Sequence, residues 1–153
     1  MNAPHGLPSR ALAPHIRVDG VNKAFETGGR TVTALQDIRL DIPRGQFTCL
    51  LGPSGCGKST LLNAVAGFSL PSSGSITVDG QAVTAPGPDR GMVFQEYALF
   101  PWMTVEDNIA FGLHIKGMGK AGIRERVDAL LGMLSLGDFR QRFPKDLSGG
   151  MRQ

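Results

Sequence analysis

Alternating apolar and polar positions are the first pattern along the chain. Ile16–Val21 and Ile38–Ile42 both alternate in this way, and a period of two residues predicts strands with one buried face. After a turn at Pro43–Gly45, Phe47–Leu51 forms a continuous apolar run. Runs of this length are typical of strands that are buried on both faces. The first fifty residues therefore predict two half-buried strands and one interior strand.

A short helix and two further strands are predicted in the next forty residues. Thr60–Ala66 has a helical pattern that ends at Gly67, a residue suited to helix C-termini. Ser75–Val78 leads into the Asp-Gly pair at 79–80, which is a strong signal for a hairpin turn. Gly91–Phe94 is another short apolar stretch and predicts a strand.

The apolar period lengthens to that of helices beyond residue 100. Val105, Ile109 and Leu113 recur four residues apart, and Thr104 with Asp107 has the spacing of a capping box at a helix start. A second amphipathic helix is marked by Ile123, Val127, Leu130, Leu131 and Leu134. The order of elements predicts an α/β core followed by a helical part.

Composition narrows the classes of protein. The chain has 153 residues, 41% apolar and 19% charged, with a net charge of +3, as expected of one globular domain. Its Lys and Arg residues are scattered, which argues against a nucleic-acid surface. No apolar run approaches the ~20 residues that span a bilayer, and Cys49 and Cys56 make neither a disulfide framework nor a zinc site. Met1–Pro14 lacks the apolar centre of a signal peptide and is expected to be a disordered leader.

The glycine-rich stretch Gly52–Ser59 matches the phosphate-loop pattern G-x-x-x-x-G-K-[ST] at every position. A predicted strand precedes it and a predicted helix follows, so backbone N–H groups and the helix N-terminus would face phosphate oxygens. Lys58 would reach the β- and γ-phosphates, and the Ser59 hydroxyl would bind Mg²⁺. The predicted nucleotide-binding residues here are Gly52, Pro53, Ser54, Gly55, Cys56, Gly57, Lys58, Ser59 and Thr60.

The loop alone does not distinguish kinases, GTPases, motors and transporters. A GTPase would need a guanine-reading N-K-x-D, and Asn22–Phe25 departs from it at the last position and precedes the loop. Leu147–Gln153 reads LSGGMRQ. A serine before two glycines at a helix start is itself an anion-binding arrangement, because a hydroxyl, free N–H groups and the helix dipole converge there.

With these two motifs in this order, the chain closely resembles the ATP-binding subunits of ABC transporters over Ile16–Gln153. Pro86–Gln95 and Leu99–Asn108 are similar to the branch that imports nitrate, sulfonates and taurine. The resemblance implies a P-loop NTPase core with an antiparallel β subdomain at about residues 15–95. A helical subdomain at about 96–147 and the signature at 147–153 would follow.

The resemblance also implies residue roles. Gln95 matches the glutamine that contacts Mg²⁺ and the attacking water, and Phe25 matches the aromatic that stacks on adenine. Ser148, Gly149 and Gly150 match the signature that binds the γ-phosphate of ATP held by the other subunit of a head-to-tail homodimer. Lys58, Gln95 and Ser148 are thus the predicted catalytic residues, and Ser59 and Gln95 the predicted metal ligands.

Partners follow from the same resemblance: ATP, a second copy of the subunit, membrane permease subunits and, indirectly, a solute-binding protein, with no nucleic acid. The aromatic-rich Tyr97–Trp102 would receive the permease, unless Phe100 and Trp102 are interior to the helical part. The subunit would lie peripherally on the cytoplasmic face of the cell membrane and couple ATP hydrolysis to uptake of a small anion.

The family pattern continues, beyond what matches Gln153, with the Walker B aspartate and the catalytic glutamate. We therefore expect a truncated or partial subunit whose 153 residues do not hydrolyse ATP by themselves and are unstable or prone to aggregate. Two alternatives remain at this point. One is a soluble ABC ATPase of DNA repair or translation, and the other is an inert nucleotide-binding remnant.

Overall fold

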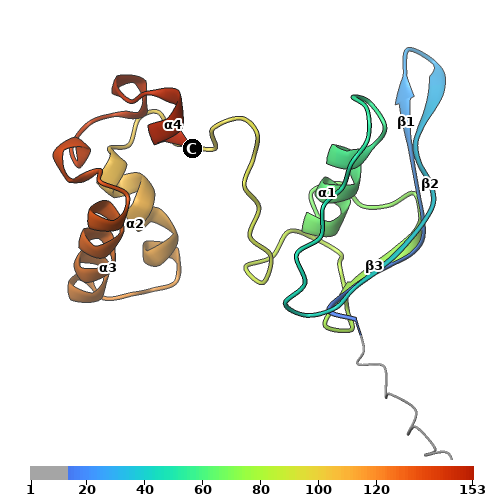
Figure 1. Cartoon of the computed structure of the whole chain (residues 1–153), viewed down its shortest axis with the longest axis horizontal. Coiled ribbons are helices and arrows are strands. Elements are labelled where there is room, and N and C mark those ends of the chain that lie inside the picture. The colour runs from blue at the N-terminus through green and yellow to red at the C-terminus, as the bar shows by residue number, and fades with distance from the viewer. Residues whose placement is uncertain (1–13) are drawn as a thin grey trace, which may run out of the picture. The chain divides into compact units, whose positions relative to one another are not determined.

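The computed structural model describes residues 14–153, which form two compact units, residues 14–92 and 93–153 (Figure 1). Apart from Pro14, the expected leader lies outside the described residues. An antiparallel sheet in the first unit and helices in the second confirm the predicted mixed α/β class.

Four antiparallel strands form the sheet of the first unit, in the order β2-β1-β3-β4. Their bounds are Ile16–Thr27 for β1, Arg30–Ile42 for β2, Ser73–Val78 for β3 and Gln81–Ala82 for β4. The alternating stretches are parts of β1 and β2, and both strands extend further than alternation alone predicts. The predicted hairpin is confirmed, because Asp79 and Gly80 have φ of 49° and 76°, the two positive values of a type I′ turn.

Helix α1, Lys58–Ala66, packs on this sheet and carries the phosphate loop at its N-terminus. Its end at Gly67 is confirmed: Gly67 is left-handed with φ 85°, and its N–H donates to the Ala64 carbonyl. The core of the first unit consists of Val18, Val21, Leu35, Leu61, Ala64, Ile76, Val78 and Val83. Burial of these side chains fixes the helix, and with it the C-terminal end of the loop, against β1–β3.

Two predicted strands are wrong. Phe47–Leu51 and Gly91–Phe94 lie in non-regular conformations, and Phe47, Leu51 and Val93 are 92%, 89% and 83% exposed. A strand exists only through hydrogen bonds to a neighbour, and within residues 14–153 neither segment joins the sheet. Apolar composition predicted burial, but it carries no information about which segment would be the partner.

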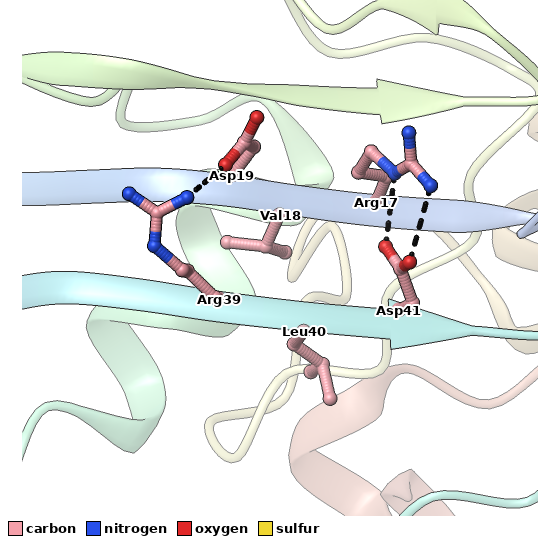
Figure 2. Close-up of a pocket in the computed structure, with 6 residues that line it drawn as sticks. All are labelled: Arg17, Val18, Asp19, Arg39, Leu40 and Asp41. Atoms are coloured by element: carbon pink, nitrogen blue, oxygen red, sulfur yellow. Dashed lines mark hydrogen bonds and ion pairs between the residues drawn. The ribbon is translucent and has the colours of Figure 1, made fainter.

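One face of β1 and β2 carries paired charges that line a shallow hollow (Figure 2). Arg17 donates to Asp41 at 3.0 and 3.2 Å, and Arg39 donates to Asp19 at 2.6 Å. All four side chains are more than half exposed, so water screens the two pairs. Each cation faces a carboxylate, which leaves this hollow with little attraction for a phosphate group.

The second unit is built from α2, Val105–Ile115, and α3, Lys120–Met133 (Figure 1). The shorter elements η1 Gly137–Phe139, η2 Pro144–Asp146 and α4 Gly149–Arg152 follow. Its core consists of Val105, Ala110, Ile123, Val127, Leu131, Leu136 and Leu147. Leu130 and Leu134 were predicted to face this core, but they are 37% and 57% exposed. Leu130 lies at the edge of the stripe formed by residues 123, 127 and 131, and Leu134 is the C-cap beyond the end of α3.

The start of α2 is fixed by side chains. The capping box is confirmed: Thr104 Oγ1 accepts from Asp107 N at 3.2 Å, and Asp107 Oδ2 accepts from Thr104 N at 3.3 Å. Asn108 adds a bond that the sequence analysis missed, since its Oδ1 accepts from Phe100 N at 2.8 Å. The Asn108 amide also donates to the Phe100 carbonyl at 3.2 Å, which closes the turn before the helix.

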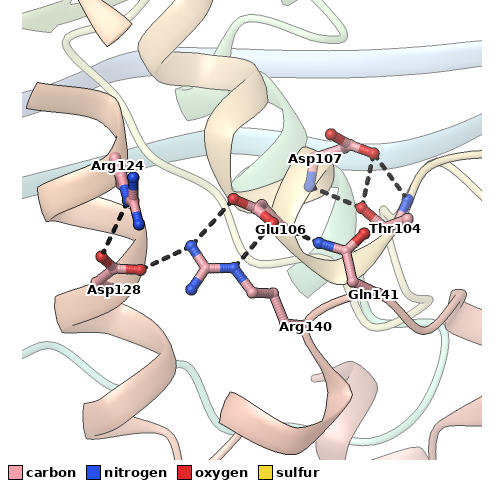
Figure 3. Close-up of polar contacts among 7 residues, drawn as sticks. All are labelled: Thr104, Glu106, Asp107, Arg124, Asp128, Arg140 and Gln141. Atoms are coloured by element: carbon pink, nitrogen blue, oxygen red, sulfur yellow. Dashed lines mark hydrogen bonds and ion pairs between the residues drawn. The ribbon is translucent and has the colours of Figure 1, made fainter. Parts of the chain in front are cut away.

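Arg140 joins both helices to the segment that precedes the signature (Figure 3). It donates to the two Glu106 carboxylate oxygens at 2.8 and 3.0 Å and to Asp128 at 2.6 Å. The Arg140 and Arg142 carbonyls accept from the Glu106 and Val105 amides at 3.0 and 2.9 Å, so this segment satisfies donors that a helix N-terminus leaves free. The signature therefore follows a segment, residues 140–142, that is hydrogen-bonded to the N-terminus of α2 and contacts α3.

These contacts predict a pH-dependent stability. The pKa of Glu106 is lowered, first by hydrogen bonds from Arg140, and only partly offset by burial. A carboxyl whose pKa is lower in the folded state stabilises it above the unfolded pKa of about 4.3 and loses that effect as pH falls through the folded value. Glu106→Gln should therefore lower the free energy of unfolding at pH 7, and its deficit should shrink as pH falls below about 4.

Urea denaturation at pH 7, 5 and 3.5 measures this difference. Glu125→Gln, at an exposed position of α3, is the matched control and should show a smaller deficit at pH 7. A Glu106→Gln deficit that stays constant or grows toward pH 3.5 would contradict the assignment.

Candidate nucleotide-binding site

The phosphate loop turns into α1 at Gly57, which has φ of 92° and is the helix N-cap. A Cβ on Gly57 would lie 2.5 Å from the Ala34 carbonyl oxygen and 3.0 Å from Leu35 Cδ2. Gly55 also has a positive φ, 82°, but a Cβ there would meet nothing within 4 Å. The backbone of the loop thus needs glycine for its conformation at both positions, and at Gly57 also for close packing on β2.

This difference predicts unequal effects of two matched substitutions. Gly55→Ala and Gly57→Ala carry the same left-handed strain, but only Gly57→Ala forces a methyl group against β2. Gly57→Ala should therefore lower the free energy of unfolding by about 1–3 kcal/mol more than Gly55→Ala. Urea denaturation of both variants checks this, and equal losses would show that the loop does not pack on β2 as described.

Lys58 is the first residue of α1, and its ammonium group turns back over the loop. Its Nζ donates to the carbonyl oxygens of Gly52 at 2.8 Å and Pro53 at 2.6 Å, and lies 3.5 Å from Cys56 Sγ. No side chain caps the helix N-terminus. A lysine ammonium group and uncapped N–H groups thus share one end of α1, an arrangement that favours an oxyanion.

The loop residues also fit a nucleotide-bound Mg²⁺. Ser59 is exposed beside Lys58, and a hydroxyl is a hard oxygen ligand of the kind that Mg²⁺ takes. Residues 14–153 hold no group of three or more His, Cys, Asp or Glu side chains placed for a metal.

Phe25, the predicted adenine contact, lies near the end of β1 opposite Val32. Its ring is 42% exposed, and Lys23 Nζ lies 5.2 Å from the ring centroid. An exposed face allows stacking on a base, and the ring is not part of the core of its unit.

Gln95 lies in the second unit, exposed and outside helices and strands. The aromatic residues after it differ in how far they are buried. Phe100 is partly buried, with its centroid 4.5 Å from that of Phe111 and 5.7 Å from that of Trp102. Trp102 is 70% exposed. The stretch therefore combines a packed aromatic side chain, Phe100, with an exposed one, Trp102.

The signature residues are in the same unit and begin α4 at Gly149. Ser148 is the N-cap, and its Oγ accepts from Met151 N at 3.4 Å. Leu147, just before it, is buried in the core of the unit. Tyr97 was predicted only as part of the docking stretch 97–102, but it also contacts this helix: Arg152 lies over its ring, with the guanidinium carbon 4.7 Å from the centroid. The stretch has no periodic pattern, so no signal in the sequence indicated this contact.

The predicted site residues therefore fall in both units. Phe25 and residues 52–60 belong to the first, and Gln95 and residues 148–150 to the second. Among the helices of residues 14–153, none has the length and apolar character needed to cross a membrane.

Curated relatives are similar to this chain over most of its length. Nitrate import ATP-binding protein NrtD from Synechocystis sp. is 46% identical over 139 residues, covering 91% of this chain and 52% of that protein. Taurine import ATP-binding protein TauB from Rhizobium johnstonii is 53% identical, covering 90% and 53%. Spermidine/putrescine import ATP-binding protein PotA from Thermobifida fusca is 46% identical, covering 95% and 38%. The chain spans about half the length of the first two relatives, and less of the third.

Solved structures agree with the sequence relatives. A dimeric post-hydrolysis state of the ATP-binding cassette MJ0796 bound to ADP and Pi has a TM-score of 0.79 and 30% identity, and the match covers 90% of this chain and 65% of that one. A second dimeric structure of MJ0796, a bacterial ABC transporter cassette, has a TM-score of 0.78. The ABC transporter family itself matches residues 35–153, and the chain therefore belongs to that family.

Proposed function

We propose that the chain is the ATP-binding part of an ABC importer subunit, which binds MgATP through residues 52–60. The observation that carries this proposal is the geometry at the start of α1. There, Lys58 Nζ holds two carbonyl oxygens of the loop at 2.6 and 2.8 Å, beside an uncapped helix N-terminus. Phosphate oxygens would be stronger acceptors for this ammonium than neutral carbonyls, because bonds between charged groups are stronger.

The proposed chemistry is in-line attack of water on the γ-phosphate of ATP in the complete subunit, which breaks the bond to the β–γ bridging oxygen and releases ADP and phosphate. On the family resemblance, the catalytic glutamate beyond what matches Gln153 would take the proton of the water. Lys58 and the loop N–H groups would stabilise the negative charge on the transferred group. Ser59 and, on the family resemblance, Gln95 would hold Mg²⁺. The bound metal ion would neutralise charge on the phosphate oxygens. Ser148, with the two glycines after it, would bind the γ-phosphate of ATP held by a second copy.

The proposed assembly is a head-to-tail homodimer on membrane permease subunits, at the cytoplasmic face of the membrane, served by a solute-binding protein. The dimeric state of the similar cassette MJ0796 supports the dimer. The exposed Trp102 beside the packed Phe100 supports a docking surface at residues 97–102.

A small anion is the proposed solute, supported by the nitrate and taurine importers among the relatives. PotA is 46% identical and named for spermidine and putrescine, so the similarity supports import more strongly than one solute. Between Gln95 and Ser148 the helices α2 and α3 have 11 and 14 residues. They leave no room for the long coiled coil expected of a DNA-repair ATPase.

Equilibrium dialysis with labelled ATP tests the proposal on the chain itself. We expect saturable binding that requires Mg²⁺ and is displaced by unlabelled ATP and ADP. AMP should displace it poorly, because AMP lacks the phosphates that Lys58 reaches. Displacement by AMP as effective as by ADP would show that the base and sugar, rather than the phosphate loop, hold the nucleotide.

A further inference from the structure

Tyr97 contacts the signature helix at two points. Its hydroxyl lies so close to Gly149 that a Cβ on that glycine would be 2.9 Å from Oη. Its ring faces Arg152, whose guanidinium carbon lies 4.7 Å from the centroid. The first and last residues of α4, Gly149 and Arg152, are thus both held by one side chain that comes from the other end of the unit's sequence.

The two glycines of the signature differ in what surrounds them. A Cβ on Gly150 would meet nothing within 4 Å, whereas one on Gly149 would press on the Tyr97 hydroxyl. Neither glycine has a positive φ, so backbone conformation does not demand glycine at either position. The close approach at position 149 within this chain therefore comes from the Tyr97 hydroxyl.

The other end of α4 depends on the same ring. Arg152 Nε is buried and has no hydrogen-bond partner among residues 14–153. An arginine that buries part of its guanidinium without a hydrogen bond there gains most from a flat aromatic face, where the ring quadrupole attracts the cation. The contact with Tyr97 supplies such a face.

We propose that Tyr97 is a positioning residue for the signature, and this rests on the proposed function. Tyr97 follows Gln95 by two residues, so a displacement of the segment after Gln95 moves the ring against which α4 is seated. The hydroxyl sets how closely Gly149 approaches, and the ring sets where Arg152 lies. Tyr97 thereby fixes where the Ser148 hydroxyl and the α4 N-terminus stand for phosphate binding.

A single fluorine probe tests the contact on the chain itself, without nucleotide. The chain contains one tyrosine, so 3-fluorotyrosine gives one ¹⁹F resonance, from position 97. Gly149→Ala and Arg152→Met should each shift this resonance. Gly150→Ala and the exposed-site control Arg126→Met should leave it in place. A resonance that Gly149→Ala moves no more than Gly150→Ala does would overturn the proposal.

A rescue experiment in a complete subunit containing this chain tests the consequence for function. Gly149→Ala should lower kcat on the order of 10- to 100-fold, as small misplacements of a reacting group do. It should leave the KM for ATP nearly unchanged. Tyr97→Phe removes the atom that the new methyl group meets, so the double variant should recover several-fold in kcat. Absence of recovery, with thermal unfolding midpoints of the two variants matched, would overturn the proposal.

The Lys58→Ala variant separates this outcome from a failure of the proposed function. If Lys58→Ala abolishes turnover and the double variant does not recover, the positioning role alone is wrong. If Lys58→Ala turns over ATP normally, the proposed function is wrong. The fluorine shifts then test only whether Tyr97 contacts α4.

Discussion

Lys58→Ala should weaken ATP binding by on the order of 10- to 150-fold. The ammonium group would make charge-assisted bonds to the β- and γ-phosphates, and such bonds contribute about 1.5–3 kcal/mol. In the absence of nucleotide the same group donates to the Gly52 and Pro53 carbonyls. Its loss therefore removes a phosphate contact and also frees the loop. Equilibrium dialysis with labelled ATP measures the change in Kd.

The control for this prediction is Lys116→Ala, which removes an exposed lysine after α2 and leaves the loop intact. Its Kd for ATP should equal that of the unmodified chain. Thermal unfolding of Lys58→Ala shows whether the loop still folds. A folded Lys58→Ala chain that binds ATP as tightly as the original would refute the assignment of the phosphate loop.

Mixing two inactive subunits should restore ATP-dependent dimers. In a head-to-tail dimer each site combines the phosphate loop of one copy with the signature of the other. Ser148→Arg homodimers have two faulty signatures, and Lys58→Ala homodimers have two faulty loops. The mixed dimer joins an intact Lys58 to an intact Ser148 in one site, and light scattering with MgATP should detect dimers only in the mixture.

This experiment uses the complete subunit and has a clear contrary outcome. Dimerisation of the Ser148→Arg subunit alone, with the affinity of the unmodified subunit, would show that the signature does not act across the interface. Each variant alone provides the control for the mixture. With equal amounts of the two variants, random pairing would make about half of the dimers mixed.

Features that depend on neighbouring residues could be predicted from the sequence. The turn at 79–80, the helix end at Gly67 and the capping box at Thr104 all arise from short-range geometry. The glycine turn into α1 at Gly57 belongs to this group, whereas phosphate binding by residues 52–60 stays a prediction. Adjacent residues determine local conformation of this kind, so its prediction needs no knowledge of the tertiary fold.

Features that depend on distant partners could not be predicted. Phe47–Leu51 reads as an interior strand, but its residues other than Leu50 are exposed, and the segment pairs with no strand within residues 14–153. The pairing of Arg140 with Glu106 and the contact of Tyr97 with Gly149 join positions far apart in the sequence. No periodicity brings such residues together, because their proximity follows from how whole elements pack.

Binding of MgATP phosphates by residues 52–60 can be measured residue by residue in a titration followed by ¹⁵N-resolved NMR. The chain is labelled with ¹⁵N, and the backbone amide resonances are followed as MgATP is added. We expect the largest shifts from Gly55, Gly57, Lys58 and Ser59; they should saturate together and be reproduced in part by ADP but not by AMP. Saturable shifts confined to other parts of the chain, or no shifts at millimolar MgATP, would contradict this assignment.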